Sequence, residues 1–376
     1  MNVAASPYEV LGFDALRERP GIGVSAAQPS GPWHLPWHSL STTEAAGPRE
    51  ELFAGNYEFH TSGSTGVPVR RVLPGARLRA DAEQLARLLA PYAPEAIVSF
   101  APPRHAYGAS ATMMLPAVTG LPVWFWPSFD CPPPPVLARR VALIAIPWTF
   151  RILARHPQWT IALEQITVLH SSAELPAEAG RFQGDGRTTM IEVLGSTETS
   201  AVAYRSGWDA AGVWTLLDDV TFAGAQTAEE APLTVSSPRL SMLADGSQPH
   251  SHEMDDLVRR HDDRRFSRTG RRAHLVKING VRHDLNGIAA QLRAALPGAD
   301  VACVRAADQL RGETYDVLVA GGGPLTVDAV RAIARGLGAT PRDVRLVDRI
   351  PRSSLGKLLA DPETSSPETS GPETSA

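Results

Sequence analysis

A run of small hydroxyl and glycine residues early in the chain has the composition of a ligand-binding loop. Residues 60–69 read HTSGSTGVPV and are flanked on both sides by apolar residues. Glycines let a backbone approach a ligand closely, and successive N–H groups in such a turn can cradle an anion. The run therefore predicts a phosphate-binding loop, although a loop without function would have the same composition. The predicted contacts are Thr61, Ser62, Gly63, Ser64, Thr65 and Gly66.

Three further segments combine charged residues with glycine and follow this loop in a fixed order. They read LGSTETS at 194–200, GRRAHLVKINGVR at 270–282 and PRSSLGK at 351–357. Weaker patterns lie between them and read RHAYGA at 104–109, VLHSSAELP at 168–176 and EMDDLV at 253–258. Each segment alone is a weak or moderate signal, but four in order are a strong one.

Taken together, the segments resemble the motifs of the adenylate-forming enzymes, a superfamily that includes acyl-CoA synthetases, luciferases and peptide-synthetase adenylation domains. The loop is similar to TSG[ST]TG-x-PK and the second segment to YG-x-TE. The third is similar to GR-x-D-x-x-IK-x-x-G-x-R and the fourth to PR-x-x-x-GK. The resemblance covers residues 57–358 and implies an AMP-forming acid ligase that uses ATP and Mg²⁺.

The resemblance also implies the reaction and its main residues. The carboxylate of an acid would attack the α-phosphate of ATP, giving an acyl-adenylate and pyrophosphate. Glu198 would bind Mg²⁺, since hard cations take carboxylate oxygen together with phosphate. Thr197 would donate to the α-phosphate, and Lys357 would bridge the acid and that phosphate. Glu198 could instead be a solvated surface acid, and Lys357 an exposed lysine.

The remaining nucleotide and substrate contacts follow from the same resemblance. Asp256 would accept hydrogen bonds from the ribose, although Asp255 competes for this role. Arg271 would reach the ribose or the phosphates, and His105 could be a packed residue rather than a substrate contact. The other predicted nucleotide contacts are Ala173, Glu174, Leu194, Gly195, Ser196 and Lys277. The predicted substrate contacts are His105, Tyr107 and Gly108.

Several positions depart from the family pattern. Val69 stands where the loop has a lysine, and either Arg70 or Arg71 could supply the charge. Leu194 replaces an aromatic residue, so stacking on adenine becomes apolar contact. Ala273 replaces an acid at the hinge about which the family's small domain rotates. These departures motivate an alternative, a non-catalytic member that binds nucleotide or acid and acts as a scaffold.

The early position of the loop suggests that the N-terminal subdomain is reduced. In this respect the chain resembles the shortened adenylate-forming proteins associated with phenazine antibiotic biosynthesis. That resemblance implies a planar aromatic carboxylic acid as substrate, and the Trp-rich segment 121–130 could line its pocket. The acyl acceptor stays open between CoA, a carrier-protein thiol and a partner reductase. A partner subunit in a homodimer could complete the missing part.

The segments with this chemistry lie in a pattern of elements typical of an α/β fold. Apolar runs that are continuous rather than alternating predict strands covered on both faces. These strands are expected at 95–100, 121–126, 142–147, 166–171 and 189–195. Helices are expected from Gly75, around Val136–Arg140 and at Thr149–Ala154, after an irregular lead-in over 1–50.

A smaller α+β domain is expected after Arg271–His274. It should contain a helix capped by Asn286, strands at 300–306, 315–321 and 344–350, and a helix from Val327 that Gly338 ends. The predicted domains are therefore a shortened N-terminal adenylate-forming domain at 1–272, a C-terminal lid domain at 273–360 and a disordered tail at 361–376. The tail repeats PETS and is rich in Pro and Ser, a composition typical of disorder.

Composition excludes several other classes. The chain has 376 residues, 43% apolar content and a formal net charge of −4, so it lacks the basic field of a nucleic-acid-binding protein. Its two cysteines, Cys131 and Cys303, make no disulfide framework, although a lone catalytic cysteine stays open. His250, His252 and Glu253 have metal-like spacing but are interpreted as a polar loop. The absence of a signal-like start or a long apolar run predicts a cytoplasmic protein away from membranes.

Overall fold

The computed structural model divides into two compact units, Met1–Ala273 and His274–Ala376. Each unit is described by itself below. The expected roles of these units, a shortened adenylate-forming domain and a lid, stay predictions. The structure describes residues 7–11, 31–39, 42–61, 69–173, 175–208, 212–224, 229–243, 245–278, 281–308, 312–337, 340–352 and 358.

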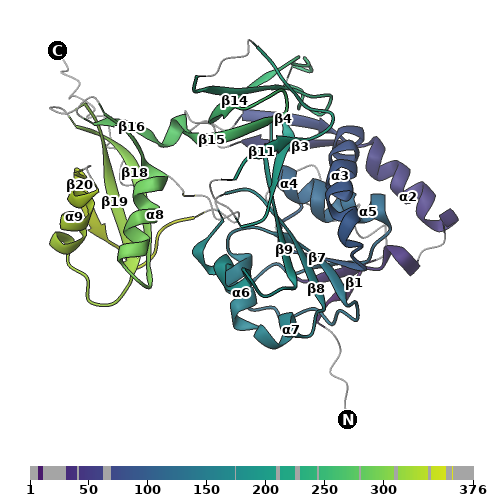
Figure 1. The fold of residues 1–376 in the computed structure, drawn as a ribbon. Helices are drawn as coiled ribbons and strands as arrows, with labels where there is room; N and C mark the ends of the chain where they lie inside the picture. Colours follow the sequence, from purple (N-terminus) through teal and green to yellow (C-terminus); the bar gives the residue numbers. More distant parts are fainter. Residues whose placement is uncertain are drawn as a thin grey trace, which may run out of the picture. The chain divides into compact units, whose positions relative to one another are not determined.

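Five parallel strands form the centre of the first unit, and all five were expected from apolar runs. They are hydrogen-bonded in the order β6-β5-β7-β8-β9. Figure 1 shows α3 and α5 on one side of these strands and α6 and α7 on the other, which explains why their residues are continuously apolar. The strands are β5 (Ala96–Ser99), β6 (Val123–Phe125), β7 (Arg140–Ala145), β8 (Gln165–His170) and β9 (Thr188–Ser196), and the helices are α3 (Gly75–Leu89), α5 (Leu115–Thr119), α6 (Thr149–Arg155) and α7 (Pro157–Ile161).

Further strands, most of them in antiparallel pairs, extend this sheet to 13 strands, and they were not expected from the sequence. One edge adds β1 (Glu9–Val10) and β2 (Trp33–Leu35). The other adds β10 (Ser200–Ser206), β11 (Trp214–Leu216), β15 (Arg265–Arg271), β14 (His252–Arg260), β13 (Ala231–Ser236) and β12 (Thr221–Phe222). A separate antiparallel hairpin joins β3 (Asn56–Thr61) to β4 (Val69–Pro74), so the glycine-hydroxyl run lies between its two strands.

The second unit is an α+β unit with its own buried core. Its strands are β16 (Leu275–Ile278) and β17 (Val281–Asp284), which form one hairpin, and β18 (Ala299–Asp308), β19 (Gly312–Gly321) and β20 (Asp343–Leu346), which form a second sheet. Its helices are α8 (Leu285–Ala295) and α9 (Val327–Gly336). Apolar residues of both helices pack with β16, β18, β19 and β20 in one cluster, which gives this unit a core independent of the first.

Three local expectations were wrong. The lead-in contains η1 (Trp37–Ser39) and the helix α2 (Thr42–Ala54), which carries Pro48 inside it. Residues 136–139 form no helix, because a run of prolines at 132–135 precedes them and Arg140 already begins β7. The cap of α8 is Asp284, whose carboxylate accepts from the backbone N–H of Asn286 at 3.1 Å. Gly338 and residues 361–376 lie outside the described residues.

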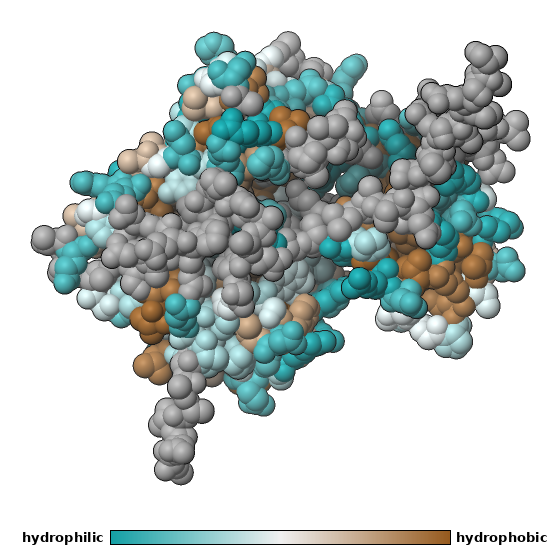
Figure 2. Space-filling view, turned by 180° about the vertical axis from the view of Figure 1, so that it is seen from behind, coloured by the Kyte–Doolittle hydropathy of each residue, from teal (hydrophilic) through white to brown (hydrophobic). Residues whose placement is uncertain are grey.

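The other short helices connect the main elements of the first unit. They are η2 (Ala90–Tyr92), α4 (Ala106–Gly108), η3 (Ala109–Met114) and η4 (Ala177–Phe182), whereas η5 (Arg272–His274) spans the sequence boundary between the two units. On the face drawn in Figure 2, apolar atoms form separate patches within a mostly polar surface. Across the part of the chain that is described, no helix is long and apolar enough to cross a membrane.

Candidate functional site

The predicted catalytic residues Thr197 and Glu198 lie in the tight turn between β9 and β10. The backbone N–H of Ser196 donates to Thr199 Oγ1 at 3.1 Å, and that of Glu198 donates to Ser196 Oγ at 3.2 Å. Ser200 closes the turn with a φ of 59°, a conformation that costs a non-glycine residue energy and is common at functional sites. The turn is therefore held in one conformation by its own hydroxyls.

Gly195 is required by the close approach of the two strands at this turn. A Cβ atom at this position would lie 2.3 Å from the backbone oxygen of Ser200. Side chains larger than hydrogen are excluded where two backbones meet so closely. The glycine of the predicted motif therefore has a steric reason within the hairpin, whatever ligand the turn binds.

The segment after β8 reaches the same edge of the sheet as the end of β9. The two strands are parallel neighbours, and Ser171 Oγ donates to the backbone oxygen of Val193 at 2.9 Å. Ser172 follows with a φ of 82°, and Ala173 is exposed. Ala173 and the end of β9, with Leu194, thus stand at the carboxyl ends of adjacent parallel strands, where α/β sheets bind ligands.

Helix α4 carries two of the three predicted substrate contacts, Tyr107 and Gly108, to the same edge. The hydroxyl of Tyr107 donates to the backbone oxygen of Leu169 at 2.8 Å, and burial raises its pKa above the ordinary value. A Cβ atom at Gly108 would lie 1.9 Å from the backbone oxygen of Pro102. His105 directly precedes the helix and is half-buried. Tyr107 and Gly108 therefore have packing roles of their own, and substrate contact by these residues stays a prediction.

An arginine from β4 faces the predicted metal ligand. Arg71 Nε lies 4.0 Å from Glu198 Oε1, and both side chains are mostly buried, with 15% and 19% exposed. The half-buried His252 of β14 lies close to both. Burial lowers the pKa of His252, with Arg71 acting in the same direction and Glu198 against it. The turn, β4 and β14 thus each contribute a residue to one group of charges.

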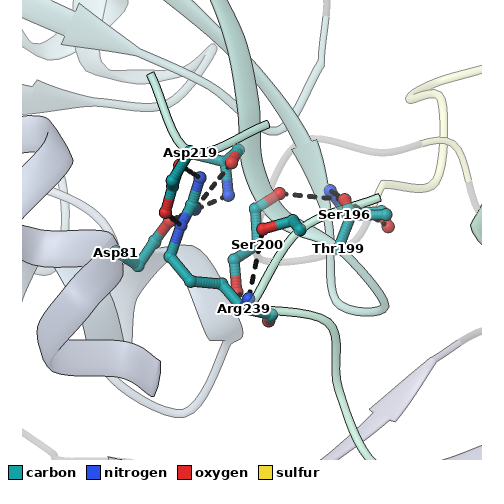
Figure 3. A network of polar contacts seen from close by, with 8 residues as sticks. Asp81, Ser196, Thr199, Ser200, Asp219 and Arg239 are labelled. Atoms are coloured by element: carbon teal, nitrogen blue, oxygen red, sulfur yellow. Dashed lines mark hydrogen bonds and ion pairs between the residues drawn. The ribbon is translucent and has the colours of Figure 1, made fainter. Parts of the chain in front are cut away.

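A buried arginine network lies beneath the turn and was not foreseen from the sequence (Figure 3). The guanidinium of Arg239 is fully buried and donates to Asp81 at 2.5 Å, to both oxygens of Asp219 at 2.7 and 2.8 Å, and to the backbone oxygen of Ala201 at 2.7 Å. Its own backbone oxygen accepts from Ser200 Oγ at 3.2 Å. These hydrogen bonds connect α3, the start of β10 and the segment that contains Arg239, and so hold the residues that follow the turn in place.

Of the two candidate ribose ligands, Asp256 is the buried one. Its side chain is 3% exposed, and its Oδ1 lies 2.7 Å from Arg268 Nε and 3.6 Å from Arg271 Nε. Asp255 is 35% exposed and lies 3.6 Å from Arg272 Nε. Asp256 and Arg271 are direct neighbours across β14 and β15, so the two predicted ribose contacts are together.

Several predicted contacts lie where the structure does not describe them. Ser62–Gly66, Glu174 and Lys357 are outside the described residues. Thr61 and Lys277 are described through their backbones, which pair with Val69 in the β3–β4 hairpin and with Arg282 in the β16–β17 hairpin. The proposed roles of these residues therefore stay predictions.

The residues present fit a divalent cation that arrives with a nucleotide. Glu198 supplies a carboxylate whose nearby cation, Arg71, lies beyond hydrogen-bond distance. Mg²⁺ is commonly held by one or two carboxylates together with substrate phosphates. Within the residues that the structure describes, no three His, Cys, Asp or Glu side chains are grouped as a metal site.

Comparisons with known proteins identify the family of the chain and its fold. A family model described as "AMP-binding enzyme" matches residues 30–226. No protein of curated function matches the chain in sequence.

Solved structures show where the fold recurs. ATP-bound MatB from Rhodopseudomonas palustris superposes with a TM-score of 0.63 at 18% identity, covering 80% of this chain and 66% of its own. O-succinylbenzoate coenzyme A synthetase from Bacillus subtilis, in complex with AMP, gives 0.62 at 17% identity, covering 80% and 67%. The anthranilate CoA ligase AuaEII, in complex with anthranoyl-AMP, gives 0.61 at 13% identity, covering 80% and 65%. The chain spans about two thirds of the length of these structures.

Proposed function

The chain belongs to the family of AMP-binding enzymes, and from that premise we propose that it activates a carboxylic acid with ATP. The acid carboxylate attacks the α-phosphate, a P–O bond forms to the acid, and the bond to the departing pyrophosphate breaks. The product is an acyl-adenylate, which a thiol of CoA or of a carrier protein, or a partner reductase, then consumes. Catalysis of this kind depends mainly on positioning and on charge stabilisation.

One observation carries the proposal. Arg71 of β4, the strand that follows the glycine-hydroxyl run, and Glu198 of the Thr197–Glu198 turn form one charged group although they are far apart in the chain. A loop of hydroxyls and N–H groups would suit the pyrophosphate, and the anchored carboxylate of Glu198 would suit a cation that bridges phosphates. Mg²⁺, when bound, would neutralise charge on the departing pyrophosphate. Thr197 would donate to the α-phosphate, and Lys357 would hold the acid carboxylate against it.

For the acid we propose an aromatic carboxylic acid. Aromatic side chains gather after the carboxyl ends of β5, β6 and β7, and Phe100 packs against Trp126 at 5.2 Å and against Trp148 at 6.1 Å between ring centroids. Trp148 is half-buried, so one ring of this cluster borders accessible space. Among the structural relatives, one is an anthranilate CoA ligase. A phenazine carboxylic acid is the member of this class to which the sequence resemblance points.

The test is ATP–pyrophosphate exchange with Mg²⁺ across aromatic acids, including phenazine carboxylic acids, and across fatty and amino acids. We expect exchange with an aromatic acid. Lys357→Ala should lower that exchange by about 100-fold or more, as the loss of a transition-state donor does. The matched control is Arg349→Ala, which removes an exposed cation from the same terminal segment and should leave exchange unchanged.

Each other result has a definite meaning. Exchange with fatty or amino acids alone would contradict the aromatic assignment while keeping the reaction. ATP binding without exchange on any acid would contradict the reaction and favour the non-catalytic scaffold. An unaffected rate in Lys357→Ala would remove that lysine from the site.

A further inference from the structure

We propose that Arg71 is a further nucleotide-binding residue, which holds the terminal phosphates and which, in the ligand-free chain, neutralises Glu198. Cation and phosphate would then bind cooperatively, because together they exchange this ion pair for two new ones. The inference rests on the proposed function, since it takes a nucleoside triphosphate and a divalent cation as the ligands. It decides between two adjacent arginines that the sequence alone leaves equivalent.

The two arginines point to opposite faces of β4. Arg70 lies on the outer face, where its Nε donates to Glu58 of β3 at 2.8 Å and its side chain is 43% exposed. Arg71 lies opposite Phe59, which is 5% exposed, and two residues before the fully buried Leu73. Side chains alternate along a strand, so this register directs Arg71 inward. Only Arg71 is therefore presented to the charged group around Glu198.

Arg71 is incompletely satisfied in this position. Its Nε is inaccessible to solvent and finds no hydrogen-bond partner among the described residues. The carboxylate oxygen of Glu198, at 4.0 Å, is beyond hydrogen-bond range. A buried donor without an acceptor is costly in free energy and rare in folded proteins, and an unbound ligand is one of its ordinary explanations.

The backbone holds the two residues in place through one short segment. Val72, next to Arg71, exchanges two hydrogen bonds with Met242, at 3.1 and 2.8 Å. The N–H of the preceding Ser241 donates to the backbone oxygen of Glu198 at 2.8 Å. Both partners are thus tied to consecutive residues, 241 and 242, so their separation is set by the fold rather than by two free side chains.

Arg71 rather than His252 is the permanent cation of this group. Burial lowers the pKa of His252, with Arg71 lowering it further against the opposing effect of Glu198 and Glu253. A guanidinium stays charged throughout the pH range of a folded protein, whereas an imidazole titrates near neutral pH. A guanidinium also presents paired N–H groups that match two phosphate oxygens.

The exchange gives cooperativity a physical cause. A cation that binds Glu198 alone leaves Arg71 buried without an anion, and a phosphate that binds Arg71 alone leaves Glu198 without a cation. When both arrive, each charged side chain has a partner and the two ligands also neutralise each other. Either ligand alone should therefore bind more weakly than it does in the presence of the other.

The test uses inorganic pyrophosphate and Mg²⁺ in calorimetric titrations of the full chain, so it does not depend on turnover. Arg71→Ala should weaken pyrophosphate binding in the presence of Mg²⁺ by about 10- to 100-fold, the usual effect of losing a charge-assisted hydrogen bond. Arg71→Lys should retain part of the affinity. The matched control is Arg70→Ala, which removes the neighbouring arginine from the outer face and should leave the affinity unchanged.

A second titration uses Mn²⁺ without nucleotide, followed by electron paramagnetic resonance. Arg71→Ala should bind Mn²⁺ at least as tightly as the unaltered chain, because the cation that competes for Glu198 is gone. Glu198→Gln should bind it more weakly. Weaker Mn²⁺ binding in Arg71→Ala would mean that the variant disturbs the turn itself and would overturn the assignment.

The outcomes separate this inference from the proposed function. Equal pyrophosphate affinity in Arg71→Ala and the unaltered chain, an equal loss in Arg70→Ala, or no pyrophosphate binding at all would overturn the inference. Pyrophosphate binding that depends on Arg71, in a chain without ATP–pyrophosphate exchange on any acid, would keep the inference and contradict the proposed reaction. Exchange that survives in Arg71→Ala with unchanged pyrophosphate affinity would do the reverse.

Discussion

Two arginines near the β9–β10 turn, Arg239 and Arg71, differ in how many of their N–H donors are hydrogen-bonded within the fold. Arg239 is fully buried and makes four hydrogen bonds, to Asp81, to both oxygens of Asp219 and to a backbone oxygen. Arg71 is mostly buried, with 15% of its side chain exposed; its ion pair with Glu198 is at 4.0 Å and its Nε has no hydrogen-bond partner among the described residues. Both are permanent cations on the inside of the first unit.

The difference separates a scaffold from a binding group. Arg239 uses four of its five N–H donors within the fold and has little capacity left for a ligand. It also holds the pKa of Asp219 below its ordinary value, although burial acts to raise that pKa. Arg71, whose Nε has no hydrogen-bond partner among the described residues, keeps that capacity. Removing Arg239 should therefore damage the fold, and removing Arg71 should damage binding.

Substitution of Arg239 should have the largest effect on the free energy of unfolding. Arg239→Met keeps much of the side-chain volume but leaves Asp81 and Asp219 buried without a cation, so the free energy of unfolding should fall by about 3–5 kcal/mol. Urea unfolding followed by circular dichroism measures it. The control is Arg264→Met, which breaks the half-exposed pair with Asp218 and should change stability by less than about 1 kcal/mol. Equal effects of the two variants would contradict the scaffold role.

Gly195→Ala should have the next largest effect, because it strains the turn that both arginines border. The added Cβ would lie 2.3 Å from the backbone oxygen of Ser200, which is also tied to the Arg239 segment. Overpacking of this kind costs about 1–3 kcal/mol in the free energy of unfolding. Gly180→Ala, at a position with open space around it, is the control. A Gly195→Ala protein as stable as the control would show that the hairpin adapts.

His170 also has a buried nitrogen, Nε2, without a hydrogen-bond partner among the described residues, but unlike Arg71 it carries no charge. Burial lowers the pKa of His170 to about 3. The unfolded chain binds a proton at this residue below its ordinary pKa of about 6.5, and the folded chain does not.

The free energy of unfolding should therefore fall as pH falls from about 6.5 towards 3, by up to about 1.4 kcal/mol per pH unit from this residue. Urea unfolding at pH 7 and pH 5 should show a smaller difference in His170→Gln than in the unaltered chain. His38→Gln, at an exposed position, should keep the full difference. An unchanged pH dependence in His170→Gln would mean that His170 takes up its proton in the folded chain.

The parallel strands could be predicted from the sequence, and the arginine networks could not. Strands β5 to β9 are covered on both faces, so their residues are continuously apolar and visible in a short window. Helix α2 was not predicted because Gly47 and Pro48, which are poor helix formers, lie within it, and because its apolar residues do not repeat at helical spacing. The carboxylates that pair with Arg239 are Asp81 of α3 and Asp219, which are distant from it in the sequence. No local residue spacing could therefore predict these ion pairs.

The choice between Arg70 and Arg71 shows the same limit on a smaller scale. The two residues are adjacent and of the same type, so the sequence alone does not distinguish them. Their difference comes from the pairing register of β4 with β3, which places Arg71 opposite Phe59 and Arg70 near Glu58. A shift of that register by one residue would exchange their faces. The residue type was thus predictable from the sequence, whereas the direction of its side chain needed the hairpin.

Arg71→Ala should have the smallest effect on the stability of the ligand-free chain, and this variant tests the comparison of the two arginines most directly. Urea unfolding of Arg71→Ala should be measured with and without Mg²⁺ and pyrophosphate. Without ligands its free energy of unfolding should stay within about 1 kcal/mol of the unaltered chain, as for an ion pair that is partly solvated. At a ligand concentration about 100 times its dissociation constant, the unaltered chain should gain about 2.7 kcal/mol, and Arg71→Ala, with its affinity lowered about 10- to 100-fold, should gain only about 0.4–1.4 kcal/mol at the same concentration. A ligand-free loss as large as that of Arg239→Met, or an undiminished gain with ligand, would contradict the account.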